Sequence, residues 1–147
     1  MTSFSEPVPA VEQQGRGARL PVPVALGRQD WPADTVPLVS ICCITYNHGQ
    51  FIRQCLDGFL MQETTFPVEI LIHDDASTDD TAAVIREYAA QYPRLFKPIL
   101  QTENQYQKGI KPNATFNFPR HPDGISPSAR ATTSGSGPTN CNTKLIF

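Results

Sequence analysis

The sequence predicts an α/β fold in which helices flank a mostly parallel sheet. Three short apolar runs, which begin at Val39, Val68 and Phe96, are too short for helices and have the character of buried strands. After each of the first two runs, apolar residues recur with the spacing of one face of a helix. Strands that alternate with helices of this length are typical of βαβ units and a parallel sheet.

The composition favours one domain and argues against several classes of protein. The chain has 147 residues, of which 39% are hydrophobic and 18% charged, and its net charge is −2. This balance gives no basic surface for nucleic acid, and no apolar run approaches the ~20 residues that span a bilayer. Because the N-terminus lacks the basic and apolar regions of a secretory signal, we expect a cytoplasmic protein with reduced, buried cysteines.

Three zones follow one another along the chain. Residues 1–37 contain six prolines and no amphipathic period, which predicts a disordered lead-in. Residues 38–120 contain the strand and helix patterns and form the predicted ordered part. Residues 121–147 include the low-complexity run SPSARATTSGSGPTN, which holds a single charge, and they are predicted to be disordered.

The first strand is expected over residues 39–44, before a polar loop. A helix is expected from Gln50 onward, because its apolar residues share one face: Phe51, Ile52, Cys55, Leu56, Phe59 and Leu60. Two strands joined through this helix are expected to lie parallel, so both should end at the same edge of the sheet.

The second strand is expected over residues 68–72. Ser77 is then expected to cap the second helix, with Asp80 as its acidic partner three residues on. The inner face of that helix is expected to consist of Ala83, Val84, Ile85 and Tyr88. The third strand, residues 96–100, contains Pro98, and a proline suits an edge strand or a bulge better than the centre of a sheet.

Two polar motifs follow the first two strands at their carboxyl ends. They are TYNHG at residues 45–49 and HDDASTDDT at residues 73–81. Ligands of open parallel sheets bind beyond this edge. A carboxylate such as Asp75 can accept the N3–H of a uracil-type base, and the ring of Tyr46 can stack on that base. The pair therefore predicts a pyrimidine nucleotide site.

A simpler interpretation is that these polar residues only turn and cap the chain. This interpretation is favoured for Ser77 and Asp80. It is weaker for Tyr46 and Asp75, because two such loops converge at one edge of the sheet.

Four segments in this order carry a resemblance to a known family. They are VSICCITYNHGQFIRQCLDGFLMQ, VEILIHDDASTDDT, ILQTENQYQKG at residues 99–109 and FNFPR at residues 116–120. The sequence resembles family two glycosyltransferases, which have the GT-A fold, a Rossmann-like fold of nucleotide-diphospho-sugar transferases. The resemblance implies that residues 38–120 are the N-terminal half of the nucleotide-sugar-binding domain.

The resemblance also implies an activity and a set of site residues. Members of the family transfer a sugar from a nucleoside-diphosphate sugar to a carbohydrate or lipid-linked acceptor, with Mg²⁺ or Mn²⁺ bridging the diphosphate. The nucleotide-binding positions carried over to this chain are Thr45, Tyr46, Asn47, Asp74 and Asp75. Of these, Asp75 is expected to hold the base, and Asp74 to support it.

The sequence departs from the family pattern after residue 120. The acidic metal motif of this subgroup, E-G-D-D, is absent from the chain, and so is the catalytic base that follows it. We therefore expect no catalytic residue and no metal ligand in this chain, and no sugar transfer. Asp79 and Asp80 are not candidates for metal ligands, because acidic residues are common in the first turn of a helix. The alternative is a non-catalytic nucleotide-binding or interaction module on the same half-fold.

We predict that the tail is a frameshifted reading of the missing metal motif after Gly124. Restoring one base before the codon of Ile125 permits the reading GYISLCEGDDFW, which contains the E-G-D-D motif. The present tail fixes two bases of each restored codon and leaves one base free, so it permits only a limited set of readings. Sequencing the gene decides the matter: a shifted frame that cannot encode E-G-D-D, or that soon meets a stop codon, would end the idea.

Overall fold

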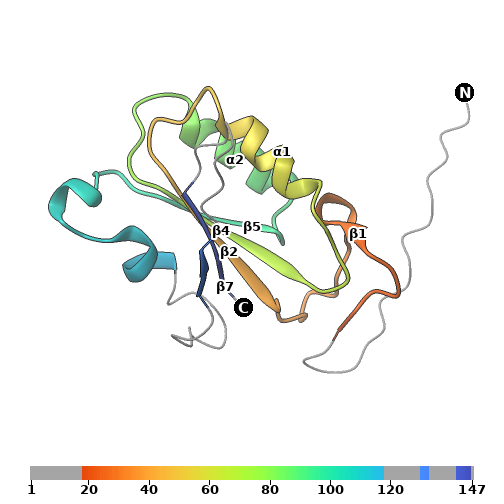
Figure 1. The fold of residues 1–147 in the computed structure, drawn as a ribbon. Helices are drawn as coiled ribbons and strands as arrows, with labels where there is room; N and C mark the ends of the chain where they lie inside the picture. Colours follow the sequence, from red (N-terminus) through yellow and green to blue (C-terminus); the bar gives the residue numbers. More distant parts are fainter. Residues whose placement is uncertain (1–17, 118–129, 133–141, 147) are drawn as a thin grey trace, which may run out of the picture.

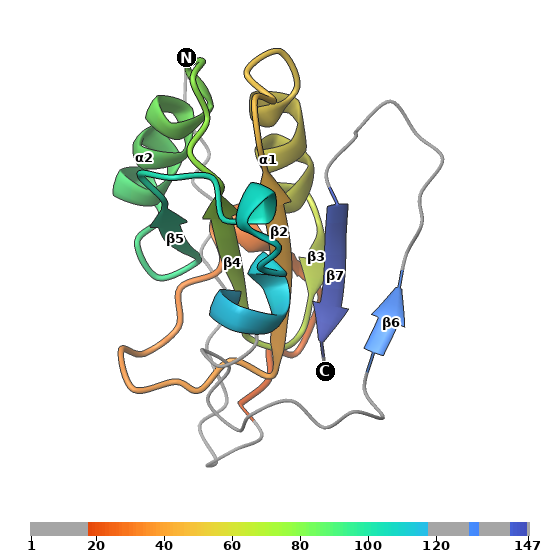
Figure 2. The same cartoon turned by 90° about the vertical axis from the view of Figure 1, so that its left-hand side faces the viewer.

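A five-stranded sheet forms the centre of the computed structural model, which describes residues 18–117, 130–132 and 142–146. The strand order is β5–β4–β2–β7–β6 (Figure 2). The strands are β2 (Val39–Thr45), β4 (Val68–Asp74), β5 (Phe96–Leu100), β6 (Arg130–Thr132) and β7 (Asn142–Ile146). Helices α1 (Ile52–Leu60) and α2 (Thr81–Gln91) lie together on one face of this sheet (Figure 1).

The three strands predicted from the apolar runs are confirmed, and so is their parallel arrangement. β2 pairs in parallel with β4, and β4 pairs in parallel with β5. A helix follows each of the first two strands, as the α/β prediction requires. β5 is the last strand on its side of the described sheet, so Pro98 lies in an edge strand, one of the two positions expected for it.

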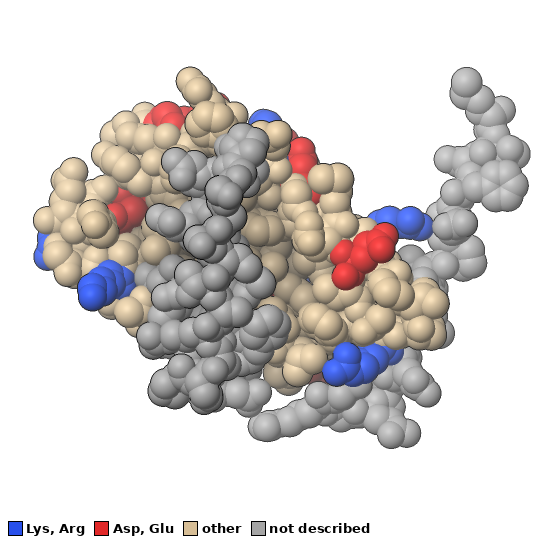
Figure 3. Space-filling model, in the orientation of Figure 1, with Lys and Arg blue, Asp and Glu red and all other residues tan. Residues whose placement is uncertain are grey.

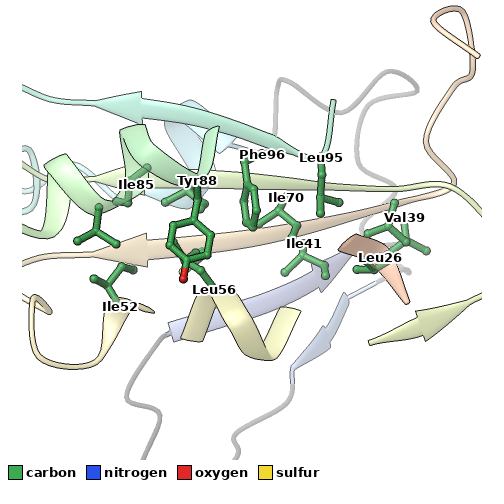
Figure 4. Packing of buried hydrophobic residues seen from close by; sticks show 14 residues of the cluster. Leu26, Val39, Ile41, Ile52, Leu56, Ile70, Ile85, Tyr88, Leu95 and Phe96 are labelled. Atoms are coloured by element: carbon green, nitrogen blue, oxygen red, sulfur yellow. The ribbon is translucent and has the colours of Figure 1, made fainter. Parts of the chain in front are cut away.

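The main core lies between the sheet and the two helices (Figure 4). Alternate residues of β2 and β4 face the helices, because successive side chains of a strand point to opposite faces. The buried residues of this layer are Leu26, Val39, Ile41, Cys43, Ile52, Leu56, Val68, Ile70, Ile72, Val84, Ile85, Tyr88, Leu95 and Phe96. The intervening positions Cys42 and Leu71 are buried as well. Burial on both faces explains why these strands read as continuous apolar runs.

The predicted cap of the second helix is wrong. α2 begins at Thr81, and its N-cap residue is Asp80, whose side chain makes no capping hydrogen bond. Ser77 lies outside the helix because its N–H and hydroxyl both donate to the carboxylate of Asp74. The predicted inner face is correct except at Ala83, which is exposed, whereas Thr81 is fully buried.

Part of the predicted lead-in packs on the domain. Residues 24 and 25 form β1 (Val24–Ala25), which pairs with β3 (Glu63–Thr64), and η2 (Leu26–Arg28) follows. Leu26 is buried in the core beside α1, and the Gln29 amide donates to the carbonyls of Val24 and Thr64. Prolines exclude regular helix from such a segment, but they do not prevent single leucines from reaching a core. The boundary at residue 37 therefore does not coincide with the first packed residue.

The edge of β2 that faces away from β4 is paired with β7. The pairing is antiparallel, with Cys42 opposite Lys144, and β6 pairs with β7 in turn. Both strands fall within residues 121–147, for which the sequence predicts no regular structure. The frameshift prediction also concerns this segment, and residues 118–129, 133–141 and 147 lie outside the described residues.

Cys42, Cys43 and Cys55 are buried, as expected from the sequence. Cys141, the fourth, lies outside the described residues. No helix in the described ranges has the length and apolar character needed to cross a membrane.

Replacing Leu56 by alanine is expected to lower the free energy of unfolding by about 2–5 kcal/mol, because this side chain is fully buried in the core. The matched control is Met61→Ala, just past the end of the same helix, where the side chain is 69% exposed. Denaturant unfolding measures both variants. Similar losses of stability would contradict the assignment of Leu56 to the core.

Candidate functional site

The carboxylate of Asp74 joins the ends of β2 and β4. Thr45 and Asp74 are partners in the parallel register, so the two motif loops leave the sheet side by side. Oδ1 of Asp74 accepts hydrogen bonds from the hydroxyls of Thr45, at 3.0 Å, and Ser77, at 2.5 Å, and Oδ2 accepts the N–H of Ser77 at 3.1 Å. This residue is almost fully buried. Thr45 and Asp74 therefore have a structural role, which is to hold the two motif loops together.

Asn47 forms a second tie between the loops. Its backbone is left-handed, with φ of 52°, a region that asparagine tolerates better than most residues. In this conformation its N–H donates to the Ser77 hydroxyl at 2.9 Å, and its Oδ1 accepts the N–H of Thr78 at 2.7 Å. Asn47 thus fixes one loop on the other.

Gly49 closes the first loop against Asp79. The N–H of Gly49 donates to Oδ2 of Asp79 at 2.9 Å, and Oδ1 of Asp79 accepts the N–H of Thr81 at 3.0 Å. Burial acts to raise the pKa of Asp79, but the bonds from Thr81 and Gly49 outweigh it and lower this pKa. These bonds give Asp79 a structural role in the loop before α2.

Asp75 follows Asp74 in the sequence, and its side chain points away from the two motif loops. It binds a third segment, which contains Gln105 and Tyr106. Its Oδ1 accepts the N–H of Gln105 at 2.7 Å, and its Oδ2 accepts the N–H of Tyr106 at 2.9 Å. These bonds fix the short helix η3 (Tyr106–Lys108) beside the ends of the strands. His73 Nε2 lies 3.4 Å from Oδ1 of the same carboxylate.

A cleft of about 620 Å³ opens between these segments at the carboxyl edge of the sheet. Its lining residues are Ile44, Tyr46, His48, Asp75, Asn104, Tyr106, Gln107, Lys111 and Pro112. Tyr46 is 41% exposed and Tyr106 is 74% exposed, so both rings present free surface to a ligand. The volume is in the range of small-molecule sites.

Of the five positions carried over from the family, the structure brings Tyr46 and Asp75 together in this cleft. Thr45, Asn47 and Asp74 are not among its lining residues and instead hold the loops. Sequence reasoning gave no role to Tyr106 or Lys111. The resemblance of residues 99–109 to the family subgroup was the signal that could have directed attention to Tyr106.

His73 lies beneath the cleft and is fully buried. Burial lowers the pKa of His73 below its usual value, although the neighbouring Asp75 and Asp74 act to raise it. The imidazole is therefore neutral near neutral pH. It stacks on Phe116 of the π-helical turn η4 (Asn113–Asn117), with ring centroids 5.1 Å apart.

Within residues 18–117, 130–132 and 142–146, no group of three or more His, Cys, Asp or Glu side chains is arranged to hold a metal ion. The carboxylates of Asp74, Asp75 and Asp79 already accept N–H and O–H donors. These residues do not fit a divalent metal.

On the face shown in Figure 3, the described lysine, arginine and acidic side chains are interspersed.

Parallel strands joined through helices, with a cleft beyond their carboxyl ends, define a Rossmann-like α/β domain. Residues 40–117 match the family model described as Glycosyl transferase family 2, which covers more than half of the chain. The chain belongs to this family, and this confirms the resemblance drawn from the sequence motifs.

Three relatives are each similar to less than half of the chain. An uncharacterized protein of Mycobacterium tuberculosis, Rv1520, is 58% identical over 66 residues, which are 45% of this chain and 19% of the relative. Chondroitin synthase of Escherichia coli is 43% identical over 60 residues, 41% of this chain and 9% of the synthase. Hyaluronan synthase of Pasteurella multocida is 39% identical over 67 residues, 46% of this chain and 7% of the synthase. The matched part thus spans a fifth or less of these relatives, and no solved structure matches the chain.

Replacing Gly49 by alanine is expected to lower the free energy of unfolding by about 1 kcal/mol. A Cβ at this position would overlap with the Asp80 carboxylate and lie 2.9 Å from Oδ2 of Asp79. Asp80 is exposed and can turn aside, whereas Asp79 is held by Thr81.

The control is Gly58→Ala, where an added Cβ meets nothing within 4 Å. Because Gly58 lies in α1, this change is expected to stabilise the protein by about 0.5–1 kcal/mol. Thermal denaturation measures both variants. A stabilising effect of Gly49→Ala would contradict the close approach of the two loops.

Proposed function

We propose that this chain binds a nucleoside-diphosphate sugar in the cleft, as the nucleotide-recognition part of a glycosyltransferase. The observation that carries the proposal is the position of Tyr46 and Asp75 in one cleft at the carboxyl edge of the parallel strands. The family to which the chain belongs supplies the class of ligand. The base is proposed to lie at Tyr46 and Asp75, and the diphosphate near Lys111 and His48, which line the same cleft.

The hydrogen-bonding capacity of Asp75 supports a base that carries an N–H donor. A carboxylate offers about four acceptor positions. Oδ1 is within reach of Gln105 N–H and His73 Nε2, and Oδ2 accepts Tyr106 N–H. One position on Oδ2 remains for a ligand. Uracil and thymine present an N3–H there, whereas cytosine presents an acceptor, which a carboxylate repels.

The aromatic and cationic lining supports the rest of the nucleotide. The half-exposed ring of Tyr46 offers a face for stacking, and each stacked base contributes about 1–3 kcal/mol by alanine substitution. Lys111 and His48 line the same cleft and can donate to phosphate oxygens. Lys108 is paired with Glu103, so Lys111 is the better candidate for the diphosphate.

Sugar transfer to an acceptor hydroxyl is the proposed activity of the whole protein. Two relatives are named for the synthesis of chondroitin and hyaluronan, which supports a carbohydrate acceptor. Mg²⁺ or Mn²⁺ is expected for the family. The described carboxylates do not fit such an ion.

UDP is expected to bind the chain at least tenfold more tightly than CDP, because the two ligands differ at the edge that meets Asp75. Tyr46→Ala is expected to weaken UDP binding about tenfold by removing the stacking surface, and Tyr46→Phe is expected to retain it. Calorimetric titration measures all three. Equal affinity for UDP and CDP, or full UDP affinity in Tyr46→Ala, would refute the proposed site.

A transfer assay separates the enzyme from the alternative of a non-catalytic binding module. The chain is incubated with UDP- and dTDP-sugars, a carbohydrate acceptor and Mg²⁺ or Mn²⁺. Nucleotide release that depends on the acceptor supports catalysis by this chain. Binding without release favours the module.

A further inference from the structure

His73 is a buried polar residue to which the proposed function gives no role. It is the penultimate residue of β4 and has no exposed surface. A buried polar ring needs compensation for lost contacts with water. Its described contacts are the carboxylate of Asp75, 3.4 Å from Nε2, and the ring of Phe116. Nδ1 is buried and has no hydrogen-bond partner among the described residues.

These contacts determine the tautomer of the ring. The oxygens of Asp75 act as acceptors toward Gln105 and Tyr106, so the nitrogen that faces this carboxylate has to be a donor. Nε2 therefore carries the proton. In the neutral ring, Nδ1 is then an acceptor, and a buried acceptor without a partner is tolerated better than a buried donor without one. The lowered pKa of His73 agrees with a ring that carries a single proton.

We propose that His73 is a positioning residue for base recognition, which holds the Asp75 carboxylate through Nε2–H so that one Oδ2 position faces the cleft. The proposal rests on the proposed function, in which Asp75 accepts the N–H of the base. Gln105 and Tyr106 lie at the start of η3, a single helical turn, whereas His73 belongs to a buried strand and is packed against Phe116. The rigid one of the three donors is therefore the imidazole.

The consequence is specific to the base. Without the Nε2–H donor, the carboxylate can turn about its last bond, and Oδ2 is no longer aimed at one donor in the ligand. Affinity for uracil is then lost selectively, while the contribution of stacking and phosphate contacts remains. A residue that only fills space beneath the cleft would change UDP and CDP binding by the same factor.

Three substitutions in the full chain test this proposal. His73→Gln places an amide N–H close to the position of Nε2, and we expect it to retain the preference for UDP over CDP. His73→Asn places its amide near Nδ1, and His73→Phe keeps a ring against Phe116 without a donor. Both are expected to reduce the UDP-to-CDP affinity ratio about tenfold. The ratio is measured by titration of each nucleotide.

A measurement on the unaltered protein completes the test. Nitrogen NMR of labelled histidine, assigned by the signal that disappears in His73→Gln, is expected to show a protonated Nε2 and a bare Nδ1. A protonated Nδ1, or an undiminished ratio in a folded His73→Asn or His73→Phe variant, overturns the role of His73. If the unaltered chain itself does not distinguish UDP from CDP, the proposed function fails, and this outcome is distinct from failure of the inference.

Discussion

The carboxylate of Asp74 is the interaction on which the arrangement of the site depends. It takes hydrogen bonds from Thr45 at the end of β2 and from both donors of Ser77, so two loops far apart in sequence share one buried acceptor. Because successive residues of a strand point to opposite faces, Asp75 then faces the other side. Asp74, which joins the two loops, and Asp75, which faces the cleft, are thus adjacent in the sequence but point in opposite directions.

The strands and the pair in the cleft could be predicted from the sequence because they follow from local patterns. Continuous apolar runs identify buried parallel strands, and polar residues after two such strands must meet at one edge. Ser77 could not be assigned correctly, because its choice between capping a helix and bonding Asp74 depends on a partner from the strand end. Leu26 was missed because a single leucine among prolines has no period.

Tyr106 and Lys111 could not be placed in the cleft from the sequence for a related reason. The segment that carries them has no strand or helix period, and its position is set by the N–H groups of Gln105 and Tyr106 on the Asp75 carboxylate. Asp75, which is proposed to recognise the ligand, therefore also holds the segment that lines one side of the cleft. Loss of Asp75 would remove the contact with the ligand and the support of this segment together, so a binding measurement on that variant does not separate the two roles.

Pro98 has a consequence for how this sheet can be extended. The N–H of Gln101 points inward to the carbonyl of Asp74, and backbone donors alternate along a strand, so position 98 faces outward from β5. Proline has no donor to offer there. A further strand, from this chain or another copy, would lack a ladder bond at this point. The outer side of β5 is thus a poor template for intermolecular strand addition, and chain association through that side is disfavoured.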